Sequence, residues 1–117
     1  MKKKRLYLAA AALALLALTA GFLLHGRAVS LGRCVVAENG TLLWIDGDQP
    51  VVLHGADSTG YATGDRLLIL HDNAIEESYP AQTRAYAVWR VGGGSAADIP
   101  PAALDGLRRL GWLKPTE

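Results

Sequence analysis

Side chains that could hydrolyse a substrate or bind a metal gather in two polar stretches, residues 54–65 and 71–73. Serine, histidine and aspartate can form a nucleophilic triad, and histidine with aspartate can bind zinc. A zinc site needs three or four well-placed donors, and closeness in sequence does not establish the geometry of a triad. We therefore predict no catalytic residue, no metal and no cofactor, and keep a small metal-dependent or hydrolytic enzyme as an alternative. The residues of that alternative are His54, Asp57, Ser58, His71 and Asp72.

A second group of polar and aromatic side chains surrounds Pro80. Proline cannot donate a backbone hydrogen bond, so it marks the start or the edge of a strand, and a Tyr-Pro bond is a candidate for the cis isomer. The neighbouring side chains either line a ligand groove or have structural roles, with Tyr79 closing the end of a barrel and Glu77 and Ser78 bonding to backbone groups. The candidate ligand-binding residues are Glu77, Ser78, Tyr79, Arg84 and Tyr86.

Residues 1–30 have the pattern of a membrane anchor or a signal segment. Three lysines and an arginine precede the apolar run of residues 6–24, which only Thr19 interrupts. As a helix this run is about 28 Å long, close to the hydrocarbon thickness of a bilayer. Basic residues before an apolar run keep that end in the cytoplasm. We predict a single-pass membrane protein with its folded part outside the cytoplasm, and the alternative is secretion after cleavage near Ala28.

The charge balance bears on nucleic-acid binding, and the single cysteine bears on disulfide formation and lipid attachment. The chain has a net charge of +1, but from Ala28 onward seven basic residues face eleven acidic ones. This acidic excess argues against binding to nucleic acid. The single cysteine, Cys34, has no partner for an internal disulfide. Arg33 stands where a lipid-anchor signal requires a small residue, so we expect Cys34 to be a small apolar side chain in a strand.

Alternation of apolar and polar residues predicts a β-barrel of about five antiparallel strands over residues 31–91. The predicted strands are residues 33–38, 41–46, 51–54, 66–71 and 83–91. Asn39-Gly40 favours a two-residue type I′ hairpin turn, which needs a positive φ at both residues. In the last strand, we expect Ala85, Ala87, Trp89 and Val91 to point inward, since small residues beside one large ring suit a tightly curved barrel.

The C-terminal part is predicted to contain a Gly-rich linker, residues 92–99, and a helix within residues 100–113. Two prolines open the helix, and leucines repeat along one side of it up to about Leu110. Gly111 is the expected left-handed cap, with Trp112 pressed onto Leu107 in a Schellman motif. The helix either covers an open end of the barrel or docks on a partner protein. The candidate partner-binding residues are Leu107 and Trp112.

One set of motifs resembles a known family. Gly64-Asp65, an apolar strand, Ile75 and the run of residues 77–82 before a closing strand resemble the bacterial domain-of-unknown-function family 3221, which comprises small exported or lipid-anchored YobA-like proteins. The resemblance covers roughly residues 33–91. It implies a small OB-like barrel and brings no established activity or catalytic residue. Because this chain lacks the lipid-anchor signal, the resemblance does not extend to lipid attachment.

Together these patterns predict a non-enzymatic, monomeric binding or interaction module at the bacterial cell envelope. It would be held in the membrane by residues 6–24 and would have an envelope protein as its partner. A further alternative is a structural subunit of a membrane complex.

Overall fold

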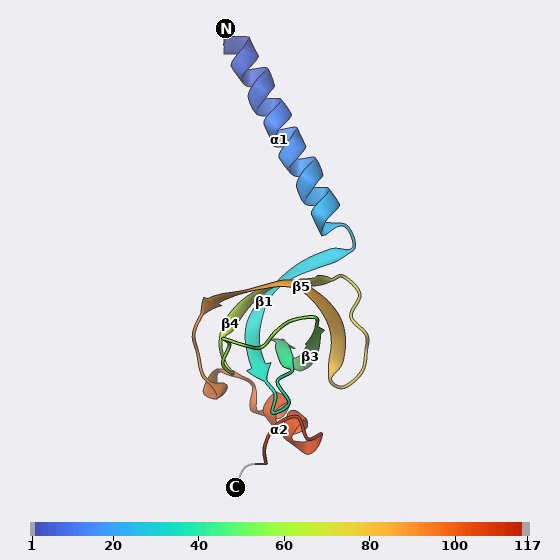
Figure 1. Cartoon of the computed structure of the whole chain (residues 1–117), viewed down its shortest axis with the longest axis vertical. Helices are drawn as coiled ribbons and strands as arrows, with labels where there is room; N and C mark the ends of the chain where they lie inside the picture. The colour runs from blue at the N-terminus through green and yellow to red at the C-terminus, as the bar shows by residue number, and fades with distance from the viewer. Residues whose placement is uncertain (1, 116–117) are drawn as a thin grey trace.

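Five β-strands close into a barrel in the order β1-β2-β3-β5-β4 in the computed structural model, which describes residues 2–115 (Figure 1). The elements are α1 (Lys2–Leu24), β1 (Arg27–Val36), β2 (Leu42–Asp46), β3 (Gln49–His54), β4 (Arg66–Asp72), β5 (Ala81–Gly92), the 3-10 helix η1 (Ala96–Asp98) and α2 (Pro101–Arg109). Residues Lys2–Phe22 of α1 are long and apolar enough to cross a membrane, and a signal sequence would have the same properties. The predicted barrel, N-terminal apolar helix and C-terminal helix are therefore all present.

The barrel is not entirely antiparallel, so this part of the prediction is wrong. Strands β3 and β5 run parallel, in register from Val51 opposite Ala81 to His54 opposite Arg84. The other four pairs are antiparallel. Strand directions can alternate all the way around a closed ring only when the number of strands is even. A closed barrel of five strands must therefore contain at least one parallel pair.

Strand β1 is long and belongs to both halves of the barrel. Its residues Arg27 to Arg33 pair with β4, and its residues Cys34 to Val36 pair with β2. Gly32 lies near the end of the first segment, opposite Leu67, and an added Cβ there would be 2.5 Å from Nε1 of Trp44. The predicted strand began at residue 33, too late by six residues, because Ser30 and Gly32 interrupt the apolar pattern. The strand begins only three residues after α1 ends.

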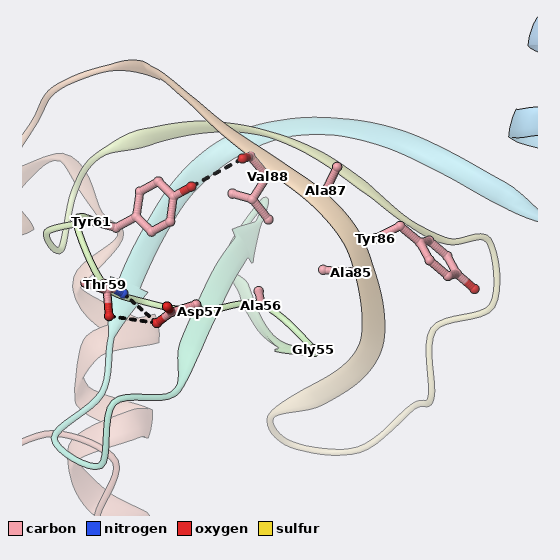
Figure 2. A pocket seen from close by; sticks show the side chains of 9 residues that line it. All are labelled: Gly55, Ala56, Asp57, Thr59, Tyr61, Ala85, Tyr86, Ala87 and Val88. Atoms are coloured by element: carbon pink, nitrogen blue, oxygen red, sulfur yellow. Dashed lines mark hydrogen bonds between the residues drawn. The ribbon is translucent and has the colours of Figure 1, made fainter.

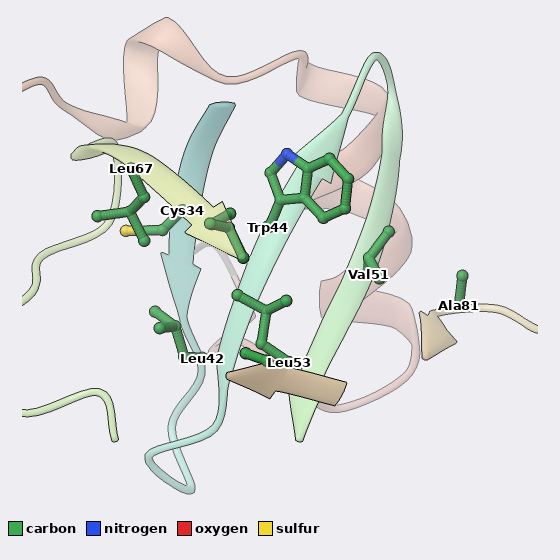
Figure 3. Packing of buried hydrophobic residues seen from close by; sticks show 9 residues of the cluster. Cys34, Leu42, Trp44, Val51, Leu53, Leu67 and Ala81 are labelled. Carbon is green, nitrogen blue, oxygen red and sulfur yellow. The ribbon is translucent and has the colours of Figure 1, made fainter. Parts of the chain in front are cut away.

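Two hydrophobic cores stabilise the fold, one inside the barrel and one outside it. The inner core contains Cys34, Leu42, Trp44, Val51, Leu53, Leu67, Ile69, Ala81 and Ala85, and Figure 3 shows most of them between the strands. The outer core joins α2 to the outward-facing side chains Val35, Leu43, Ile45 and Val52. Alternate residues of β2 and β3 thus enter different cores, so both faces of these strands are buried. Helix α2 lies against the outer wall of the barrel and does not close an open end.

The prediction that Trp89 points into the barrel is wrong. Leu70 is opposite Ala87 and His71 is opposite Ala85, so Tyr86 has no counterpart on β4. One extra residue in a strand reverses which face the following side chains occupy. Val88 consequently packs against the inner core, while Trp89 is 51% exposed. Of the four side chains predicted to point inward, only Ala85 belongs to the inner core.

The β1–β2 hairpin differs in detail from the predicted type I′ turn. The N–H of Gly40 donates to the carbonyl of Ala37, and the N–H of Ala37 donates to the carbonyl of Thr41. Gly40 has φ +85°, whereas Asn39 does not have a positive φ. The loop therefore has three residues, with an ordinary turn followed by one left-handed glycine. The type I′ prediction is wrong because the pairing ends at Ala37 and Thr41, one residue short of what a two-residue loop requires, and leaves residues 38–40 in the loop.

The Gly-rich segment after β5 is held against the barrel instead of forming a free tether. The Arg33 guanidinium donates from Nη1 to the carbonyls of Gly64 and Gly93, at 3.1 and 3.0 Å. Ser95 and Asp98 form a reciprocal capping box at η1. These contacts fix where α2 begins, and so they position the helix on β2 and β3.

Candidate ligand groove

Three hollows on the outside of the barrel share Trp112, and two of them also share His54 of β3. The central hollow has a volume of about 350 Å³, and its walls are Val52, His54, Ser78, Tyr79, Pro80, Gln82, Leu110 and Trp112. A second hollow extends from Trp112 to Glu38 and Asn39. A third shares both Trp112 and His54 and reaches Ala56. We call the combined depression the groove. Its floor is β3, and its ends are the β1–β2 loop and the β4–β5 loop.

Trp112 is positioned by the end of α2. Its N–H donates to the carbonyl of Leu107 at 2.9 Å, and the N–H of Gly111 donates to the carbonyl of Arg108 at 3.1 Å. With Gly111 at φ +84°, this is the predicted Schellman motif. The Trp112 carbonyl accepts from the N–H of Glu38 at 3.0 Å, which joins the helix end to the β1–β2 loop. Leu107 is fully buried beneath, so it cannot contact a partner, contrary to the prediction.

Tyr79 forms the facing wall of the groove. The Tyr79-Pro80 bond is cis, as the sequence suggested, and the Ser78 hydroxyl donates to the Pro80 carbonyl at 2.8 Å. The Tyr79 ring lies against α2 at Gly106, where an added Cβ would be 2.9 Å from Cζ and would overlap the hydroxyl oxygen. Sequence analysis missed Gly106. A glycine inside a nine-residue helix lowers the stability of the helix, and its presence there despite this loss was the one sequence signal that a side chain packs closely against it.

A polar pair, formed by His54 of β3 and Gln82 of β5, lies on the floor of the groove. The His54 imidazole donates from Nε2 to Oε1 of Gln82 at 2.8 Å. The parallel pairing of β3 and β5 brings these two side chains together, since Val52 is opposite Gln82 and His54 is opposite Arg84. An amide and an imidazole beside two aromatic rings provide hydrogen-bonding groups within an apolar depression.

The five predicted ligand-binding residues do not all lie in the groove. Ser78 and Tyr79 line the central hollow, and Arg84 lines an adjoining one together with His54 and Gln82. Glu77 is exposed on the β4–β5 loop. Tyr86 lies elsewhere, on the outer face of β5 (Figure 2). The groove therefore contains two of the five residues, Ser78 and Tyr79, and Arg84 lies beside it. Sequence reasoning missed His54 and Gln82 as groove residues.

Tyr86 is surrounded by charged groups. Its hydroxyl donates to Oδ1 of Asp72, and the guanidinium of Arg27 lies 4.0 Å from the centre of its ring. The guanidinium of Arg84 lies 5.7 Å from the same ring. The hydrogen bond to Asp72 raises the pKa of Tyr86, and desolvation adds to this shift. The cluster holds the ring on the outer surface of the barrel.

A separate hollow of about 270 Å³ lies beside β5, lined by residues 55–57, 59, 61 and 85–88 (Figure 2). The Asp57 carboxylate accepts from the N–H and the hydroxyl of Thr59, at 2.9 and 2.8 Å, and these bonds lower the pKa of Asp57. The Tyr61 hydroxyl donates to the carbonyl of Val88 at 3.2 Å. The polar groups of this hollow are thus bonded to their own loop and strand.

The residues of the enzymatic alternative bond to different partners. His71 is buried inside the barrel, 5.0 Å from the Trp44 ring, where its Nδ1 donates to the Asp72 carbonyl and its Nε2 accepts from the Ser30 hydroxyl. His54 bonds to Gln82, and Asp57 bonds to Thr59. Within residues 2–115, no three side chains of histidine, cysteine, aspartate or glutamate come together as metal ligands.

Comparison of this chain with models of known protein families, with curated proteins and with solved structures found no match.

Proposed function

We propose that this chain is a membrane-anchored, monomeric binding module whose groove holds an extended peptide segment of a cell-envelope protein. The observation that carries the proposal is that three hollows share Trp112 and together reach from the β1–β2 loop to the β4–β5 loop. An elongated groove fits a chain-like ligand better than a compact metabolite. Aromatic side chains with a few hydrogen-bonding groups are typical of sites that bind protein partners.

The strand order supports an OB-like barrel. Strand β1 pairs with both β2 and β4, and β3 is parallel to β5. OB-folds bind their ligands with the face of strands 2 and 3 and with the loops between strands 1 and 2 and between strands 4 and 5. The same two loops border the groove here, which favours it as the binding site. Helix α2 covers the outer face of β2 and β3, so the open surface is restricted to the edge of the helix.

The predicted family and location accord with this proposal. The run of residues 77–82, which carries the resemblance to family 3221, contributes the Tyr79 wall and Gln82 to the groove. The apolar helix α1, preceded by Lys2, Lys3, Lys4 and Arg5, would anchor the barrel outside the cytoplasm. The acidic balance of the part after α1 disfavours nucleic acid as the ligand.

The test uses the full-length protein in lipid nanodiscs, on which a random dodecapeptide display library is selected. We expect the selected peptides to converge on a motif with an apolar or aromatic residue. Affinities for the purified peptides are then compared between the wild type, His54→Ala, Trp112→Ala and the control Asp48→Ala. His54 and Asp48 are both exposed, and Asp48 lies in the β2–β3 turn.

We expect His54→Ala and Trp112→Ala to weaken binding at least about tenfold, which corresponds to about 1.4 kcal/mol. The control should bind as the wild type does. Failure of the library to converge, or equal affinities in all four proteins, would overturn the proposal. The Schellman bonds of Trp112 use its backbone, so Trp112→Ala retains the helix cap.

A further inference from the structure

The outer surface formed by β1, β4 and β5 is apolar and uncovered. Leu31, Leu68 and Trp89 stand opposite one another across the three strands, as do Val29, Leu70 and Ala87 in the next row. Paired residues of neighbouring strands point to the same side of a sheet. On β4, Leu67 and Ile69 belong to the inner core, so the alternate residues Leu68 and Leu70, with their rows, face outward. We call the set Val29, Leu31, Leu68, Leu70 and Trp89 the bare face.

The members of the bare face nearest to α1 are strongly exposed. Val29 is 53% exposed and Leu31 is 54% exposed. A contiguous apolar surface of this kind on a small protein marks an interaction site.

The bare face begins almost directly after the apolar helix. Helix α1 ends at Leu24 and β1 begins at Arg27, so the start of the strand lies within about 11 Å of the helix end. Strands β1 and β5 form the side of the barrel nearest to α1 (Figure 1). When α1 spans a bilayer, this short link holds the strand beside the polar headgroup layer, which is about 5–8 Å thick.

Arginines and aromatic rings accompany the apolar residues on this surface. Arg27, Arg66 and Arg84 occupy the outward positions of their strands, since their neighbours Ala28, Leu67 and Ala85 stand at inward positions. Arg27 lies over the ring of Tyr86, whose hydroxyl bonds to Asp72. Aromatic rings settle at the boundary between hydrocarbon and water, and arginines there attract anionic headgroups. The surface therefore has the composition of a membrane-contacting surface.

We propose that the bare face of β1, β4 and β5 docks on the headgroup layer of the membrane that α1 spans. The inference rests on the proposed anchoring by α1 and concerns a different surface from the groove. Docking places the groove and α2 on the far side of the barrel, where they remain open to a ligand. Two copies pairing through the same face would bring Arg27, Arg66 and Arg84 toward their counterparts, and like charges oppose such an arrangement.

The test measures where the bare face lies relative to lipid. The full-length chain with Leu31→Cys or Trp89→Cys is spin-labelled and reconstituted at one copy per nanodisc of zwitterionic and anionic phospholipid. Cys34 is fully buried and its thiol donates to the Ala62 carbonyl at 3.2 Å, so the label reacts with the new cysteine. The control is Asp105→Cys on the exposed side of α2. Two label positions guard against one substitution disturbing the surface.

We expect both labels on the bare face to be several-fold more accessible to dissolved oxygen, relative to a water-soluble nickel complex, than the label at the control position. Equal accessibility ratios at the three positions would overturn the inference. A further outcome would be labels that are exposed to water at one copy per disc and show dipolar broadening at two copies per disc. This result would assign the bare face to contact with a second copy and would also overturn the inference.

A flotation experiment with liposomes separates the two proposals. Protein that does not float with the lipid contradicts the anchoring by α1 and, with it, the docking. Protein that floats but keeps a water-exposed bare face contradicts the docking alone. Peptide binding by the groove is a third, independent readout.

Discussion

The barrel has two apolar outer surfaces, and a helix covers only one of them. On the outside of β2, β3 and the end of β1, the side chains Val35, Leu43, Ile45 and Val52 are buried together with α2. On the outside of β1, β4 and β5, Val29, Leu31 and Trp89 are exposed. Strand β1 contributes to both surfaces, with Val35 in one and Leu31 in the other. The difference therefore comes from what packs on the strands and not from the strands' own apolar pattern.

The largest expected effect is the loss of stability when the covered surface is damaged. Leu107→Ala removes a fully buried side chain between α2 and the barrel and should lower the free energy of unfolding by about 2–5 kcal/mol. Leu31→Ala on the bare face should change it by no more than about 0.5 kcal/mol. Denaturant unfolding of the full chain in detergent micelles, followed by circular dichroism, measures both. Similar losses in the two variants would mean that the two surfaces do not differ in packing.

The next effect concerns Gly32, which pairs with β4 two positions before the pairing of β1 passes to β2 at Cys34. Gly32→Ala places a Cβ 2.5 Å from Nε1 and 2.7 Å from Cδ1 of the buried Trp44. Overpacking of this kind should cost about 1–3 kcal/mol. Gly92→Ala is the matched control, because a Cβ there meets Arg66 at an ordinary 3.6 Å. If both substitutions cost the same in denaturant unfolding, the close approach of Trp44 does not constrain β1.

The inner side of β1 should show a pH dependence that its outer side lacks. Burial raises the pKa of the Cys34 thiol from 9.0 to about 11, and the carboxylate of Asp65 adds to the shift. The folded state then holds the proton more tightly than the unfolded state. The stabilisation is fully present below pH 9 and is lost as the pH rises toward 11.

Cys34→Ala should reduce the fall in melting temperature between pH 9 and pH 11, compared with the wild type measured in parallel. At pH 8, a thiol reagent should modify Cys34 far more slowly than the exposed cysteine of Asp105→Cys. Equal modification rates would show that the thiol is not protected by the barrel.

The smallest expected change in stability is at the border between the covered surface and the groove. Gly106→Ala improves the helix propensity of α2 by about 1 kcal/mol but displaces the Tyr79 ring from its place against the helix. We expect a net change in unfolding free energy within about 1 kcal/mol, together with weaker peptide binding. A shifted Tyr79 ring signal in NMR spectra would show that the ring has moved. If the peptide affinity were nevertheless unchanged, Tyr79 would not contribute to peptide binding.

Sequence reasoning located most elements and only part of the candidate site. The α2 helix, its Gly111 cap and the contact of Trp112 with Leu107 followed from residues close together in the chain. Ser78 and Tyr79, predicted to bind a ligand, and Trp112, predicted to bind a partner, all line the groove, and a proline and a helix cap mark them locally. His54 and Gln82 were not selected, since the parallel pairing of β3 with β5 brings them together across 28 residues.

The sequence by itself determined the apolar N-terminal helix, the strand-forming runs and the capped C-terminal helix. Each of these depends on backbone preferences and on side-chain patterns within a few consecutive residues. Tertiary structure alone decided that β3 and β5 are parallel, that Trp89 faces outward after the bulge at Tyr86, and that α2 covers one outer surface and leaves the other open. The physical reason is that ring closure, register and helix placement depend on contacts between segments distant in the chain.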